Sequence, residues 1–184
     1  MLLIALLFLL VFALVVFYFR LYNSLILGKN EAENGWSQID VQLKRRHDLI
    51  PNLVASVKGY MDHERETLER VIAARARAME ARSSGERAAA EGELSGLLSR
   101  LLVVSENYPQ LKADRNVADL MEELRTTENG IAFARQHYND TVMALNYKIE
   151  AFPWKMLAPG MGLVKRAPFE LKEMEQREAP KVTL

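Results

Sequence analysis

An uncharged apolar run at the N-terminus constrains the fold of this chain more than any other feature. Every residue from Met1 to Phe19 is apolar, and the first charge is Arg20. As a helix, residues 2–19 would rise about 27 Å, enough to cross the hydrocarbon core of a bilayer. No charge precedes the run, and large aromatic residues follow it where a signal peptide would have small ones, which favours a retained anchor over a cleaved signal. The sequence therefore predicts a transmembrane anchor over residues 1–22.

The residues at the end of this run suit the membrane–water interface. The candidate interfacial anchors here are Tyr18, Arg20 and Tyr22. Positive charge flanks the run only on its C-terminal side, at Arg20 and Lys29, which favours an external N-terminus and a cytoplasmic bulk. Because Glu31 and Glu33 lie close by, the opposite orientation stays open.

Composition excludes several classes of partner and chemistry. All 24 basic and 24 acidic residues follow the apolar run, so the net charge is zero. A balanced chain with a pI near 6.9 lacks the basic footprint that nucleic acid requires. The absence of cysteine removes disulfides, thiolate nucleophiles and cysteine-ligated metals. We expect one water-exposed domain behind the anchor and no nucleic-acid partner.

Beyond the anchor, apolar residues recur three and four positions apart, as in amphipathic helices. Breaks at Ser83-Ser84-Gly85 and at Tyr108-Pro109 separate these segments. The predicted helices cover residues 28–46, 49–82, 87–107 and 117–150. We predict a chain reversal before Pro51, with Asp48 as the helix N-cap. The resulting fold is all-α, a transmembrane helix followed by an antiparallel up-and-down four-helix bundle over residues 28–151. The alternative is three long helices, the first kinked at Pro51.

The C-terminal tail, residues 152–184, begins with a segment suited to a membrane surface. An even number of antiparallel helices would return the chain to the membrane face near Ala151. The candidate interfacial residues of the tail are Phe152, Trp154, Lys155, Lys165 and Arg166, because aromatic side chains bracketed by basic ones are typical of interfacial segments. The alternative is a tail that packs along the bundle.

A polar and charged group before and after the predicted reversal is the candidate docking surface for a partner. Its members are Trp36, Gln38, Asp40, Arg45, Arg46, Asp48 and Asn52. The charged run at Lys44-Arg45-Arg46 has a second interpretation as a solvated helix face. The amphipathic members of the group also have a second interpretation, as a hydrogen-bonded network that fixes helix register.

No enzymatic site or cofactor site is predicted. His63 with its acidic neighbours resembles the phosphoacceptor of a histidine kinase, but no ATP-binding domain accompanies it. A di-metal site in a helical bundle needs a carboxylate three residues before a histidine. Lys44, Tyr60 and Ala134 occupy those positions, so we expect neither a bound metal nor catalysis.

Long motifs in the chain resemble the LemA family of bacterial membrane proteins. They are NGWSQIDVQLKRRHDLIPNLV at residues 34–54, ENYPQLKA at 106–113, IAFARQHYND at 131–140 and EAPKV at 178–182. Gly35 and Gly130 depart from the family pattern, which more often has a better helix former at these positions. The resemblance covers the chain from the anchor to its last residues.

The resemblance implies a single-pass protein of the bacterial cytoplasmic (inner) membrane with a helical-bundle domain and no established enzyme activity or cofactor. Some relatives are encoded beside a membrane metalloprotease, and a distant one serves magnetosome membranes. We therefore expect an envelope scaffold or adaptor whose partners are the lipid bilayer and an unknown envelope or membrane protein, with a homo-oligomer as a further option. The alternative is a lipid-binding or membrane-remodelling homo-oligomer.

Overall fold

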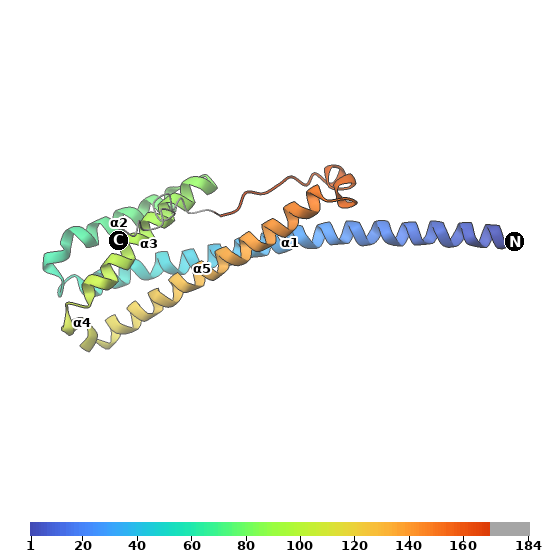
Figure 1. The fold of residues 1–184 in the computed structure, drawn as a ribbon. Coiled ribbons are helices and arrows are strands. Elements are labelled where there is room, and N and C mark those ends of the chain that lie inside the picture. The colour runs from blue at the N-terminus through green and yellow to red at the C-terminus, as the bar shows by residue number, and fades with distance from the viewer. Residues whose placement is uncertain (170–184) are drawn as a thin grey trace, which may run out of the picture. The chain divides into compact units, whose positions relative to one another are not determined.

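The computed structural model describes residues 1–169, which are helical or irregular throughout (Figure 1). The elements are α1 (Leu2–Val57), η1 (Asp62–Glu64), α2 (Arg65–Glu80), α3 (Ser84–Ser105), α4 (Pro109–Ala113), α5 (Arg115–Glu150), η2 (Trp154–Met156) and η3 (Pro159–Met161). The prediction of an all-α fold that begins with a long apolar helix is confirmed.

The chain forms two compact units. The first, here named the anchor unit, contains Met1–Asp40 and Phe133–Pro168; the second, the core unit, contains Val41–Ala132 and the chain from Phe169. The sequence predicted one bundle over residues 28–151, whereas the structure divides this range between the two units. The physical reason is helix length: α2 and α3 have 16 and 22 residues against 36 in α5, and α2 and α3 lie wholly in the core unit.

The N-terminal part of α1 is long and apolar enough to cross a membrane, and none of its 18-residue apolar window is buried within the described chain. Phe8 and Leu9 in this window are 72% and 66% exposed. Displaying such side chains to water would cost each of them about 1.5–3 kcal/mol, which burial in lipid avoids. The window therefore has the properties of a membrane anchor.

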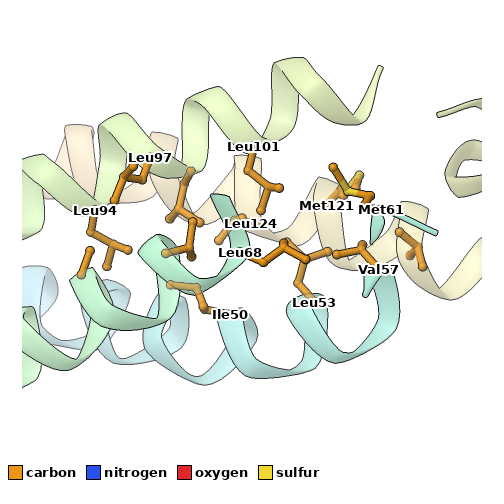
Figure 2. Close-up of a cluster of buried hydrophobic side chains, with 14 of the residues drawn as sticks. Ile50, Leu53, Val57, Met61, Leu68, Leu94, Leu97, Leu101, Met121 and Leu124 are labelled. Atoms are coloured by element: carbon orange, nitrogen blue, oxygen red, sulfur yellow. The ribbon is translucent and has the colours of Figure 1, made fainter. Parts of the chain in front are cut away.

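One hydrophobic core holds the core unit together, and its side chains come from all four of the longer helices (Figure 2). Its wholly buried members include Ile50, Leu53, Met61, Leu94, Leu98, Leu101, Leu111 and Leu124. Within α3, Leu94, Leu98 and Leu101 are spaced three or four residues apart and so share one face. The C-terminal part of α1 thus packs with α2, α3 and the N-terminal part of α5.

The predicted reversal before Pro51 is wrong, because α1 runs through Pro51 to Val57. Proline lacks an N–H group, so Pro51 leaves the carbonyl of His47 without its helical partner. Arg75 of α2 satisfies this carbonyl, since its Nε donates to the His47 oxygen at 2.7 Å. The helix can therefore continue, and it keeps Ile50 and Leu53 in the core. The reversal instead follows Val57, so the helix predicted over 49–82 is divided between α1 and α2.

The remaining turns coincide with the breaks in the sequence pattern. Ser83 and Glu86 form a reciprocal capping box before α3, in which each side chain accepts a hydrogen bond at 3.2 Å from the other residue's backbone N–H. Asp114 caps α5 in a similar way, because its Oδ1 accepts from the backbone N–H groups of Asn116 and Val117 at 3.0 and 3.3 Å.

Candidate functional site

Neighbouring arginines of α1, Arg45 and Arg46, have opposite environments. Successive residues of an α-helix point about 100° apart. The Arg45 side chain is 50% exposed, whereas that of Arg46 is wholly buried. The predicted docking surface therefore loses Arg46 and retains Arg45.

Arg45 lines a surface hollow of the core unit with a volume of about 540 Å³. The residues around it are Val41, Lys44, Arg45, Asp48, Leu49 and Asn52 of α1 and Glu123 of α5. The structure thus brings together three of the predicted docking residues, Arg45, Asp48 and Asn52, along one face of α1. We call this feature the docking hollow.

The charges of the docking hollow are only partly neutralised. Arg45 donates to Glu123 Oε1 from its Nη2 at 2.7 Å and from its Nε at 3.2 Å. Lys44 and Asp48 are exposed, and neither lies within ion-pair distance of an opposite charge among the side chains that the structure describes. One positive and one negative charge therefore remain available beside Val41, which is 64% exposed.

Arg46 is the centre of a buried ionic cluster behind this face. Its Nη2 pairs with Glu91 of α3, and its Nη1 donates at 2.6 Å both to Glu128 Oε1 of α5 and to Ser95 Oγ of α3. Ser95 Oγ in turn donates to the second Glu128 oxygen at 2.9 Å. The guanidinium group occupies the position between two carboxylates and ties α1 to both α3 and α5.

Electrostatic partners compensate for the burial of Glu91, whose side chain is 3% exposed. Burial by itself would raise the pKa of the Glu91 carboxyl group. The hydrogen bond with His47, whose Nε2 lies 3.1 Å from Glu91 Oε1, and the positive charge of Arg46 outweigh it, so the pKa lies below its ordinary value. Glu91 therefore stays ionised at neutral pH and attracts Arg46 as a full charge.

The other predicted docking residues, Trp36, Gln38 and Asp40, belong to the anchor unit. Trp36 is half-buried, and its ring meets that of Tyr138 edge to face, with centroids 5.3 Å apart. Gln38 is exposed, whereas Asp40 is half-buried. Trp36 thus packs α1 against α5 within this unit, which agrees with a role in fixing helix register.

The predicted interfacial residues are mostly exposed. In the anchor, Tyr18 and Tyr22 are 48% and 38% exposed, and Arg20 is exposed as well. In the tail, the exposed candidates are Phe152, Lys155 and Lys165. Trp154 and Arg166 are half-buried, and Arg166 Nη2 donates to Glu33 Oε1 at 2.8 Å.

A family model described as "LemA family" matches residues 35–184. The chain belongs to the LemA family. A protein named LemA from Metamycoplasma hominis is 27% identical over 168 residues, which is 88% of this chain and 75% of the relative. The magnetosome protein MamQ 2 of Paramagnetospirillum magneticum is 24% identical over 188 residues, 88% of this chain and 68% of the relative. The magnetosome protein MamQ of Magnetospirillum gryphiswaldense is 23% identical over 163 residues, which is 74% of this chain and 60% of the relative.

The LemA-like motifs supply much of this geometry. The motif at residues 34–54 carries the docking hollow residues of α1 together with Arg46 and His47. The motif at residues 131–140 carries Tyr138, the ring partner of Trp36. In this LemA family member the first motif therefore has two faces, one toward the buried cluster and one toward the docking hollow.

Sequence reasoning missed Glu91, Ser95 and Glu128. A signal for the cluster was nevertheless present, since Arg46 falls in the apolar stripe of α1, three residues after Leu43 and four before Ile50. Glu91 likewise lies three residues before the buried Leu94. Opposite charges on two apolar stripes indicate a buried ion pair, because an unpaired buried charge is costly.

Proposed function

We propose that this LemA family protein is a non-enzymatic scaffold or adaptor of the bacterial cytoplasmic membrane, anchored by the apolar part of α1. In this proposal the core unit lies in the cytoplasm and presents the docking hollow to another envelope protein. The observation that carries the proposal is the combination, in one hollow, of exposed Val41 with the unpaired charges of Lys44 and Asp48.

The chemistry of the hollow favours a protein segment as the partner. Val41, which is 64% exposed, offers apolar surface, while Lys44 and Asp48 offer charges of opposite sign. An amphipathic partner segment can cover the apolar surface and present a carboxylate to Lys44 and a basic group to Asp48. Charge complementarity of this kind gives specificity and register to protein interfaces.

The buried cluster supports the scaffold role, because it holds the hollow in a fixed shape. Arg46 ties the same turn of α1 to α3 and α5. A preformed surface loses less conformational entropy on binding than a flexible one. The charges of the docking hollow are therefore already positioned before a partner binds.

Site-specific photo-crosslinking in cells tests this proposal. A photoreactive amino acid would replace Val41, which is 64% exposed in the hollow, or Val103 of α3, which is 66% exposed elsewhere on the core unit. We expect a protein adduct of defined mass from position 41 that position 103 does not give. Identical adducts from both positions, or no protein adduct from position 41, would contradict the proposal.

Protease accessibility tests the orientation. In spheroplasts, externally added protease should leave the core unit intact and should digest it only after the membrane is opened. Digestion in intact spheroplasts would place the core unit outside the cytoplasm.

A lipid-binding homo-oligomer is the second candidate function. The observation in its favour is the set of exposed apolar side chains that follow α5, with Phe152 and Met156 at 77% and 75% exposure. In-cell cross-linking separates the two candidates, because this one predicts adducts only with lipid and with other copies of the chain.

A further inference from the structure

The segment that follows α5 is an ordered loop pinned to the anchor unit. The side chain of Asn146 holds the backbone of Arg166 from both sides: its Nδ2 donates to the Arg166 carbonyl at 2.8 Å, and its Oδ1 accepts from the Arg166 N–H at 2.9 Å. Gly162 ends η3 with a φ of 66°, a left-handed conformation that suits glycine. We call residues 152–164 the pinned loop.

The pinned loop exposes large apolar side chains. Phe152, Met156 and Val164 are 77%, 75% and 74% exposed, as much as the residues of the membrane anchor itself. Lys155 is also exposed, which adds a positive charge beside them. Side chains of this kind held outward by an ordered backbone match the chemistry of the interfacial region of a bilayer.

The loop lies at the level where α1 leaves its apolar run. Near the end of α5, Lys148 Nζ donates to the Ser24 carbonyl of α1 at 3.2 Å, and Figure 1 shows the loop directly after this end of α5. Ser24 is four residues, or about 6 Å, beyond Arg20. The headgroup region extends about 5–8 Å from each side of the hydrocarbon core. The start of the pinned loop is therefore at headgroup depth when residues 2–19 cross the bilayer.

From this position and chemistry we infer that the pinned loop is a second membrane contact, in which Phe152, Met156 and Val164 enter the interface of the same leaflet from which α1 emerges. The inference goes beyond the proposed docking function. It rests on membrane anchoring by α1 and is independent of the docking hollow. Two attachments would restrict the rotation and tilt of the anchor unit against the membrane.

Fluorescence quenching by lipid tests this contact in the full chain. Because the sequence has no cysteine, single cysteines at Phe152, Met156 or Val164 can each carry one environment-sensitive fluorophore. The labelled protein is reconstituted into vesicles of phosphatidylethanolamine and phosphatidylglycerol, with or without doxyl-labelled lipid. Leu9→Cys reports on the anchor, and Val103→Cys, at an exposed position of the core unit, is the matched control.

We expect doxyl lipid to reduce the fluorescence of all three loop labels, by an amount between the losses at Leu9 and at Val103. Combining Phe152→Asp with Met156→Asp should abolish the loss at position 164, because two carboxylates disfavour entry into an anionic interface. Quenching at Leu9 with no more quenching in the loop than at Val103 would overturn the second contact alone. Absence of quenching at Leu9 would overturn the anchor and the loop contact together, and neither result bears on the docking hollow.

Discussion

Replacing Arg46 by methionine should be among the most destabilising single changes on α1. The variant keeps a long side chain with good helix propensity but removes the only group that pairs with both Glu91 and Glu128 among the ion pairs of residues 1–169. Glu91, with 3% of its side chain exposed, then loses its guanidinium partner and keeps only the contact with His47 at 3.1 Å. Breaking a buried pair in this way costs about 3–5 kcal/mol.

Arg45→Met provides the matched control, because it removes the same kind of side chain from the next position of the same helix. Its partner, Glu123, is 41% exposed, so water can solvate the Glu123 carboxylate once Arg45 is removed. Exposed ion pairs contribute about 0.2–1 kcal/mol. The loss of unfolding free energy should therefore be severalfold larger for Arg46→Met than for Arg45→Met.

Urea unfolding of the full chain in a non-ionic detergent, followed by far-ultraviolet circular dichroism, measures this difference. With a urea dependence of about 2 kcal/mol per molar, the midpoint should fall by about 1.5–2.5 M for Arg46→Met and by less than about 0.5 M for Arg45→Met. Adding Glu91→Gln to Arg46→Met should recover about 0.5–3 kcal/mol relative to the sum of the single effects. Equal midpoints for Arg45→Met and Arg46→Met would refute the buried cluster.

Three further predictions test other parts of the structure. Arg75→Met should cost about 1–2 kcal/mol in unfolding free energy in the wild type, but nearly nothing beside Pro51→Ala, which restores the N–H group for the His47 carbonyl; an equal cost in both backgrounds would contradict this account of Pro51. The pKa of Glu91 lies below its ordinary 4.5 in the folded state, so its stabilisation is complete above that value and is lost as the pH falls through the folded-state pKa. Between about pH 5 and pH 3 the wild type should therefore lose more unfolding free energy than Glu91→Gln. Parallel pH profiles of the two proteins would argue against a stabilising Glu91 carboxylate. Gly35→Val should weaken the anchor unit by about 1–3 kcal/mol, because even a Cβ atom would lie 3.1 Å from the Tyr138 backbone. Gly130→Ala should be neutral or stabilising by up to about 1 kcal/mol, since its Cβ meets only the movable end of Gln42; similar losses in both glycine variants would count against this reading of the two contacts.

Much of the fold follows from the sequence, because it rests on periodicity and on local signals. The three- and four-residue spacing predicts the helices. The Ser83 cap lies at the first break in the sequence pattern, and the Asp114 cap follows shortly after the second, Tyr108-Pro109. The course of the chain at Pro51 could not be predicted in this way. It depends on Arg75, which is 24 positions away and satisfies the carbonyl that the proline leaves free.

The candidate site was predictable only in part, for a related reason. Arg45 and Arg46 look alike in a basic run, and only the apolar stripe on either side of Arg46 distinguishes them. Glu91 and Glu128 come from other helices, so their convergence on Arg46 is a tertiary property. The docking hollow is likewise lined in part by Glu123 of α5. The local sequence pattern around Asp48 and Asn52 does not reveal this contribution from another helix.

The most direct test of the docking proposal exchanges the two unpaired charges of the hollow. Lys44→Asp combined with Asp48→Lys keeps the net charge and leaves the Arg45–Glu123 pair in place, so the urea midpoint should stay within about 0.5 M of the wild type. The yield of the protein adduct photo-crosslinked from position 41 should fall to the level seen from position 103. An unchanged adduct at unchanged yield would show that the partner does not recognise the charges of Lys44 and Asp48, and would contradict the charge complementarity on which the proposed function rests.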